Sequence, residues 1–121
     1  MANIYIVDDE VLMRKVVKRL VDGLGYNTST FENATQLLES LAKNIPDLVV
    51  MDTEMNGLKG YEACKRARQL YGNTFGIIGM SGKEEFQKDW IEAGADAFIG
   101  KPFSITEFRD TIKTTLEKYT I

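Results

Sequence analysis

The stretch Leu48-Val49-Val50-Met51-Asp52 places four apolar residues in a row before a single carboxylate. A short apolar run bounded by polar residues is typical of a strand that is buried on both faces. The residues that follow, 53–57, are expected to form a loop. In an open parallel sheet, reactive groups lie at the carboxyl ends of the strands, which is where this pattern places Asp52. The alternative is that Asp52 only caps the next helix.

The apolar pattern on both sides of this stretch predicts four further strands and five helices in alternation. The strands are expected at residues 4–7, 26–31, 74–80 and 95–99. The helices are expected from residue 11 until Gly23 or Gly25 ends the first, after Asn33 through at least Leu41, at 60–71, at 84–93, and from 105 to about 119. Asn33 and Ser104 are predicted N-caps. Such alternation indicates an α/β fold with a five-stranded parallel, doubly wound sheet and helices on both faces. We expect residues 1–121 to form one domain.

Composition excludes several functions. The net charge is −3, so the chain lacks a global basic field and no direct nucleic acid binding is expected. The absence of histidine excludes Ser-His and Cys-His catalysis and a phosphohistidine in this chain. The one cysteine, Cys64, excludes an internal disulfide. The sequence shows neither a signal peptide nor an apolar run that could span a bilayer, so a cytoplasmic protein without a membrane partner is expected.

Polar residues follow four of the predicted strands, namely Asp8-Asp9, Asp52, Ser81 and Lys101. Because the carboxyl ends of parallel strands share one edge, these side chains are expected to converge. Three carboxylates cannot all stay ionised together without counter-charge, and Lys101 supplies only one positive charge. Magnesium fits best, since it takes oxygen ligands and pairs carboxylates with phosphate. Taken singly, the acids would be a solvated helix start, Ser81 a turn residue and Lys101 a surface lysine.

Together these residues predict a phosphoryl-transfer site. Asp52 can act as a carboxylate nucleophile that forms an acyl phosphate. A bound metal would neutralise the carboxylate and phosphoryl oxygens, while Lys101 and the Ser81 hydroxyl would hold the remaining phosphoryl oxygens. Gly82 would leave room beside the phosphoryl group, or is simply a turn glycine.

With these motifs in place, the chain resembles the receiver domain of two-component response regulators, which has a flavodoxin-like, CheY-like fold. The resemblance extends from Ile4 to about Tyr119 and implies that a sensor histidine kinase or a histidine phosphotransfer protein phosphorylates Asp52. It is carried by Asp8-Asp9, by Asp52 after Leu-Val-Val-Met, by Ser81, by the run 93–98, and by Lys101-Pro102-Phe103.

The resemblance also implies roles for single residues. Asp9 and Asp52 would ligate magnesium with Asp8 close by, and the backbone carbonyl of Glu54 would complete the protein ligands. Ser81 and Phe98 would move on phosphorylation, although Phe98 is equally consistent with ordinary strand packing. The Lys101-Pro102 bond would be cis.

Other positions of the family's pattern are variable or altered here. Glu54, Lys83 and Gly82 occupy positions that tune the phosphoryl lifetime, and we predict an ion pair between Glu54 and Lys83 over the mouth of the site. Asn56 and Lys59 depart from the family's usual proline and aspartate, which puts loop rigidity in doubt but not the chemistry.

Three functions remain open from the sequence. The favoured one is a phosphorylation switch, not a turnover enzyme, that acts alone or as part of a longer protein. It would signal to a downstream protein target through the fourth helix, fifth strand and fifth helix, around Trp90, Phe98 and Phe108, as a monomer or a phosphorylation-dependent dimer. The alternative for Trp90 is a position in the core or partly in the core, which is the more usual place for a tryptophan. A haloacid dehalogenase-like phosphatase is disfavoured because its nucleophile comes first in the chain. A phosphorylation-independent interaction module would not need the complete set of acids, Ser81 and Lys101.

Overall fold

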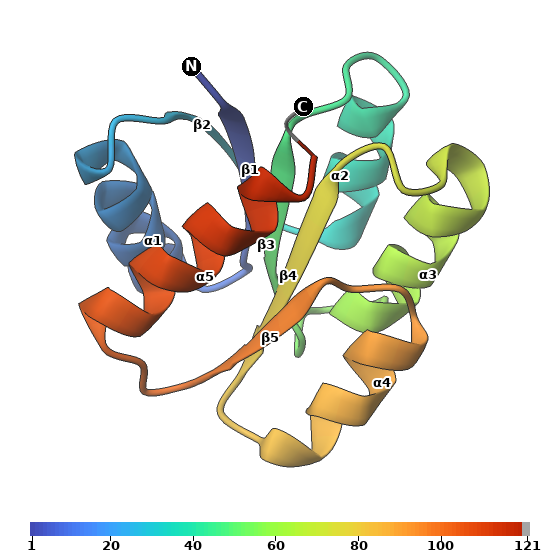
Figure 1. Cartoon of the computed structure of the whole chain (residues 1–121). Helices are drawn as coiled ribbons and strands as arrows, with labels where there is room; N and C mark the ends of the chain where they lie inside the picture. Colours follow the sequence, from blue (N-terminus) through green and yellow to red (C-terminus); the bar gives the residue numbers. More distant parts are fainter. Residues whose placement is uncertain (120–121) are drawn as a thin grey trace.

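The computed structural model describes residues 1–119 and contains a single five-stranded sheet with the strand order β2-β1-β3-β4-β5. All four neighbouring pairs of strands are parallel. The strands are β1 (Asn3–Val7), β2 (Asn27–Phe31), β3 (Leu48–Asp52), β4 (Gly76–Ser81) and β5 (Ala97–Gly100), and they lie in the middle of the molecule (Figure 1). The doubly wound α/β fold predicted from the sequence is therefore confirmed.

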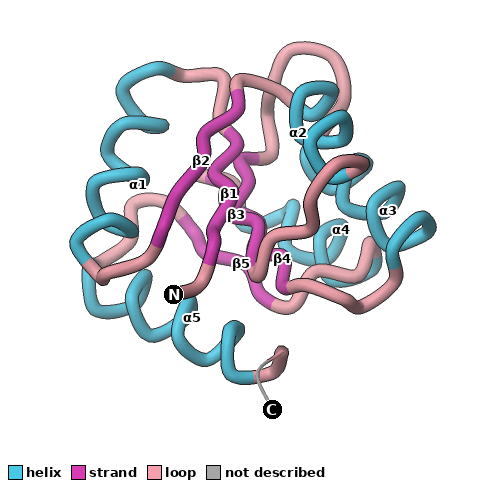
Figure 2. The backbone as a smooth tube through the Cα atoms, turned by 90° about the horizontal axis from the view of Figure 1, so that it is seen from above, coloured by secondary structure: helices cyan, strands magenta, loops and turns pink. Residues whose placement is uncertain are grey.

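The helices cover both faces of the sheet, as the views in Figures 1 and 2 show. One face carries α1 (Val11–Gly23) and α5 (Ile105–Glu117), and the other carries α2 (Ala34–Leu41), α3 (Gly60–Tyr71) and α4 (Gln87–Glu92). Strand β3 is buried throughout its apolar run because it lies at the centre of the sheet and faces both layers of helices. Within residues 1–119, no helix is long and apolar enough to cross a membrane.

Both predicted N-caps are present. Asn33 Oδ1 accepts a hydrogen bond from the Gln36 N–H at 2.9 Å, and Ser104 Oγ accepts one from the Glu107 N–H at 3.0 Å. Each bond satisfies a backbone donor that has no partner within its own helix.

The predicted helix 84–93 and the strand after it differ from the structure in detail. Residues Glu84–Phe86 form a 3-10 turn, and the α-helix covers only Gln87–Glu92. The strand β5 begins at Ala97 and not at residue 95, because the Ala95 N–H still donates to the Trp90 carbonyl at 3.0 Å and belongs to the end of α4. Residue 95 therefore still belongs to the turn that ends α4, and the chain joins the sheet two residues later.

Candidate functional site

Three carboxylates meet at the carboxyl ends of β1 and β3. Asp8 and Asp9 follow β1 and Asp52 ends β3, and one carboxylate oxygen from each lies within 4.8 Å of the others. The Asp8 side chain is buried and accepts a hydrogen bond from the Glu10 N–H at 2.9 Å, while Asp9 accepts one from the Asn56 N–H at 3.1 Å. These backbone donors fix two of the acids before any ligand is bound.

Among the residues that the structure describes, Lys101 is the cation that pairs with these carboxylate side chains. Its Nζ lies 2.8 Å from Asp52 Oδ1 and 4.0 Å from Asp8 Oδ2. The backbone N–H of Lys101 donates to the Ser81 carbonyl at 2.8 Å, which holds the end of β5 against the end of β4, and the Lys101-Pro102 bond is cis as predicted. One positive charge against three carboxylates leaves the site with excess negative charge.

Asp8 shows the consequence of that imbalance. Among residues 1–119, its Oδ2 is the buried side-chain nitrogen or oxygen atom that has no hydrogen-bond partner. The pKa of Asp8 is raised from 3.8 to about 6, mainly by burial and in smaller part by the neighbouring charges of Asp52 and Asp9, although the Glu10 N–H and Lys101 each lower it. A cation beside Oδ2 would give this oxygen a partner and would offset the excess negative charge. The carboxylate oxygens are the ligands that a hard divalent cation prefers.

The remaining predicted residues surround this cluster. Ser81 is buried and its Oγ accepts a hydrogen bond from the Lys83 N–H at 3.0 Å, and a side chain at Gly82 would meet nothing within 4 Å. Phe98 is half-buried against the core beneath α4. The predicted ion pair is present, with Lys83 Nζ 3.0 Å from Glu54 Oε1 between the loops that follow β4 and β3. The role of the Glu54 carbonyl as a metal ligand stays a prediction.

The prediction of a readout surface around Trp90 and Phe108 was wrong for these two side chains, and the core alternative holds for Trp90. Both are buried, Trp90 on the inner face of α4 and Phe108 on the inner face of α5. On α4 the exposed apolar side chain is instead that of Ile91, which is 49% exposed.

Three contacts around the site were missed by sequence reasoning. The Arg14 guanidinium donates to the Asp8 carbonyl at 2.7 Å. The Trp90 indole N–H donates to Thr53 Oγ1 at 2.7 Å, and the Thr53 hydroxyl donates to the Met80 carbonyl at 2.7 Å. Gly79, in the middle of a buried strand, was the available signal, because a strand glycine often marks close approach by a neighbouring group.

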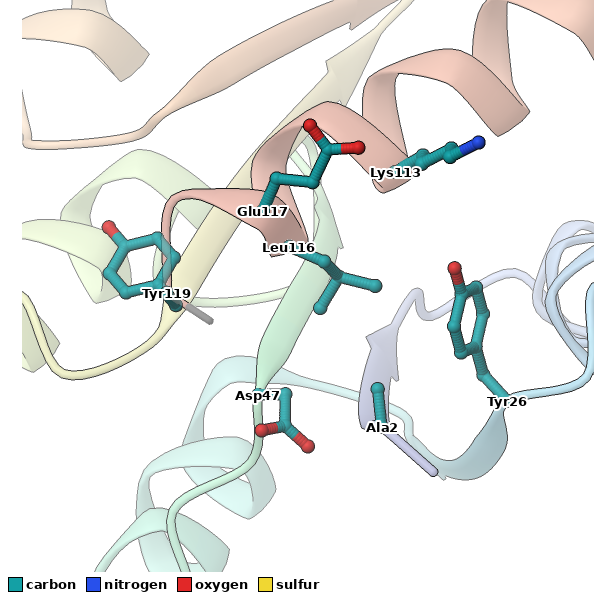
Figure 3. A pocket seen from close by; sticks show the side chains of 7 residues that line it. All are labelled: Ala2, Tyr26, Asp47, Lys113, Leu116, Glu117 and Tyr119. Carbon is teal, nitrogen blue, oxygen red and sulfur yellow. The ribbon is translucent and has the colours of Figure 1, made fainter. Parts of the chain in front are cut away.

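A surface hollow lies at the opposite end of the sheet from the carboxylates. Figure 3 shows side chains from the residues just before β1, β2 and β3, and from the last turns of α5 and the residues after it, around the hollow. The Asp47 carboxylate at its edge already accepts a hydrogen bond from the Asn3 N–H at 2.7 Å. The hollow includes none of the predicted site residues; it is lined by Ala2, Tyr26, Asp47, Lys113, Leu116, Glu117 and Tyr119.

A comparison with known protein families shows which family has this fold and this set of site residues. The family model described as the response regulator receiver domain matches residues 4–113, which include the three carboxylates, Ser81 and Lys101. The chain belongs to the response regulator receiver domain family. Within residues 1–119, the acidic cluster lies where a receiver domain's phosphoacceptor is expected, at the carboxyl ends of the central strands.

Curated receiver-containing proteins show the same relationship. The chain is 34% identical over 115 residues to sporulation initiation phosphotransferase F of Bacillus subtilis, with 94% of this chain and 93% of that protein covered. It is 34% identical over 119 residues to the sensor histidine kinase RcsC of Escherichia coli and 28% identical over 118 residues to the response regulator MprA of a Mycobacterium species. The chain spans 12% of RcsC and 51% of MprA, and the match to each covers 96% of the chain.

Solved receiver structures share the fold throughout. The response regulator TrrA from Thermotoga maritima, solved in complex with Mg²⁺-BeF, is 29% identical, with a TM-score of 0.88 and 95% of this chain and 99% of that chain covered. A CheY-like receiver domain protein from Methanospirillum hungatei is 25% identical, with a TM-score of 0.90 and 98% and 96% covered. The receiver fold identified from the sequence is therefore confirmed.

Proposed function

We propose that this receiver accepts a phosphoryl group on Asp52 from a phosphohistidine of a sensor histidine kinase or of a histidine phosphotransfer protein. The observation that carries this proposal is the convergence of three carboxylates with Lys101 at the carboxyl edge of the sheet. Receiver domains as a class take their phosphoryl group from such donors, and the resemblance to sporulation initiation phosphotransferase F over nearly its whole length supports a role within a phosphorelay.

In the proposed step, a carboxylate oxygen of Asp52 attacks phosphorus as the bond from phosphorus to the donor's imidazole nitrogen breaks. The product is an acyl phosphate on Asp52 and an unphosphorylated histidine on the donor. Lys101, which now pairs with Asp52 Oδ1, is close enough to follow the charge onto a phosphoryl oxygen. The buried Ser81 hydroxyl offers the next donor once it turns from the Lys83 N–H. Phe98, on the neighbouring strand, pairs with Gly79, two residues before Ser81.

Asp8, Asp9 and Asp52 fit a magnesium ion, with the Glu54 carbonyl as a further predicted ligand. The unpartnered Oδ2 of Asp8 and the uncompensated charge support this assignment. When bound, magnesium supplies the positive charge that lets an anionic phosphoryl group approach an anionic carboxylate.

The phosphorylated form would signal through the surface of α4, β5 and α5 to a downstream protein target. On α4 this surface presents Ile91 together with Lys88 and Glu92. We propose that the chain works as a switch and not as a turnover enzyme, because one carboxylate accepts one phosphoryl group. The oligomeric state after phosphorylation and the cytoplasmic location stay predictions.

The donor assignment is tested by mixing the chain with a histidine kinase domain that carries a radiolabelled phosphohistidine. We expect the label to move to this chain in the presence of magnesium and to be lost in alkali, as acyl phosphates are. Label that stays on the kinase would contradict the proposed donor class. Repeated turnover of small phosphate esters would instead favour a phosphatase.

A further inference from the structure

Trp90 is linked by hydrogen bonds to the main chain beside Asp52. Its indole N–H donates to Thr53 Oγ1, and the Thr53 hydroxyl donates to the Met80 carbonyl, both at 2.7 Å. Thr53 follows Asp52 directly, and Met80 precedes Ser81. The Thr53 side chain and Trp90 are fully buried. One hydroxyl therefore connects β3, β4 and α4 immediately beneath the candidate site.

Two glycines leave the space that the indole ring occupies. A Cβ on Gly60 would lie 2.7 Å from Trp90 Cζ2 and would also collide with the Asp52 carbonyl oxygen. A Cβ on Gly79 would collide with the Trp90 ring itself. The Gly60 N–H, in addition, donates to the Thr53 carbonyl at 2.9 Å. The ring therefore packs between the start of α3 and the middle of β4, and its N–H reaches the residue that follows Asp52.

The hydrogen bonds of Trp90 and Thr53 couple the position of Thr53 to that of α4. A buried indole N–H and a buried hydroxyl each need a partner, because a buried group that loses its hydrogen bond is costly. A shift of α4 relative to β3 would break the Trp90–Thr53 bond, so the position of Thr53 depends on that of α4. The Asp52 carboxylate is held by Lys101 on its outer side, while the backbone behind it is held through Thr53.

We propose that Trp90 is a positioning residue for phosphoryl acceptance, which acts through the Thr53 hydroxyl to fix the main chain carrying the Asp52 carboxylate and to connect it to α4. The proposal rests on the function proposed above, since it concerns the same carboxylate. It also makes Trp90 a reporter, because a change at Asp52 that moves Thr53 alters the surroundings of the indole ring.

The test uses three substitutions in the full chain. Trp90→Phe keeps an aromatic ring without the N–H, Thr53→Val keeps the side-chain shape without the hydroxyl, and Thr53→Ser keeps the hydroxyl. Each variant is incubated with acetyl phosphate and magnesium, and the fraction phosphorylated is followed by intact mass. We expect Trp90→Phe and Thr53→Val each to slow phosphorylation roughly two- to tenfold, the range that one hydrogen bond is worth. Thr53→Ser restores the native rate, and the double variant is no slower than the slower single variant.

A control separates positioning from stability. Ile112→Val removes one methylene from the core on the other face of the sheet, where it touches neither Thr53 nor Trp90, and the rate per folded molecule should match that of the native chain. Trp90 is the single tryptophan of the chain, so its emission gives a second readout. We expect emission to change on phosphorylation of the native chain and to stay constant in Asp52→Asn.

The outcomes distinguish the two proposals. If Trp90→Phe and Thr53→Val are phosphorylated at the native rate, or if Ile112→Val slows the reaction as much as they do, Trp90 only fills space and the positioning role is wrong. If the native chain itself gains no phosphoryl group, the proposed function is wrong, and the positioning role falls with it.

Discussion

The two ends of the sheet hold carboxylates whose charges are paired to very different degrees. At the carboxyl end, Asp8 Oδ2 has no hydrogen bond, and Lys101 is shared between Asp8 and Asp52 in a cluster of three acids. At the amino end, Asp96 lies 3.1 Å from the Arg68 guanidinium, and the Tyr119 hydroxyl lies 2.9 and 3.0 Å from its two oxygens. Asp96 also accepts a hydrogen bond from a backbone N–H of β4 at 2.9 Å.

This difference in pairing indicates that one cluster serves stability and the other serves function. The amino-end cluster is fully paired and joins the ends of α3, β4 and α5, so its role is to hold the fold together. The carboxyl-end cluster is incompletely paired, which costs stability until a cation or a phosphoryl group completes it. The same substitution, aspartate to asparagine, should therefore have opposite effects at the two ends.

The largest effect on stability is expected at the paired end. Asp96→Asn leaves the Arg68 guanidinium, whose side chain is only 9% exposed, without its counter-charge. Breaking such a pair should lower the free energy of unfolding by about 3–5 kcal/mol. Urea denaturation measures this loss, and magnesium affinity at the other end should not change. Native-like stability would show that the cluster contributes little.

The next effect is a pH dependence of the metal-free protein. The unfolded chain releases the Asp8 proton near its ordinary pKa of 3.8, whereas the folded chain keeps it to about pH 6. Between these values the folded state binds more protons, so the stability that Asp8 contributes is lost as pH rises, by roughly 3 kcal/mol. Urea denaturation in chelator from pH 4 to 8, compared with Asp8→Asn, isolates this term from other carboxylates. A constant difference between the two proteins would contradict the account.

A smaller effect of opposite sign to that at Asp96 is expected for Asp8→Asn itself. At pH 7 without metal, this variant should be more stable than the native chain by about 2 kcal/mol, because it removes a buried charge and can keep the bond from the Glu10 N–H. Magnesium should then stabilise the native chain and not the variant. Thermal melts with and without magnesium measure both differences, and destabilisation by Asp8→Asn would show that the native carboxylate is already satisfied.

The smallest effect concerns the exposed Glu54–Lys83 pair. The pairing lowers the pKa of Glu54, through its hydrogen bond to Lys83, but both side chains face solvent, so neither Glu54→Ala nor Lys83→Ala should change stability measurably. Each should instead shorten the lifetime of phosphorylated Asp52, because the pair hinders the hydrolytic water. Loss of the phosphoryl group is followed after removal of acetyl phosphate, and lifetimes equal to the native one in both variants would refute the gating role.

The sequence predicted the fold and the convergence of the site because both depend on local patterns. The apolar run of β3 and the polar residues at successive strand ends are visible within short stretches, and the sheet topology brings them together. The Trp90–Thr53 bond joins residues 37 positions apart, and its geometry is set by packing that no periodicity encodes. For the same reason the sequence left Trp90 open between the core and a readout surface, although the space that Gly79 leaves is filled by its ring.

The central claim is that Asp52 accepts a phosphoryl group in a site whose excess negative charge requires magnesium. It is tested most directly by incubating the chain with acetyl phosphate and magnesium and measuring its intact mass. The native chain should gain the mass of one phosphoryl group, the gain should disappear when magnesium is chelated, and Asp52→Asn should show none. A native chain that stays unmodified, or an Asp52→Asn variant that gains the same mass, would contradict the assignment of Asp52 as the acceptor.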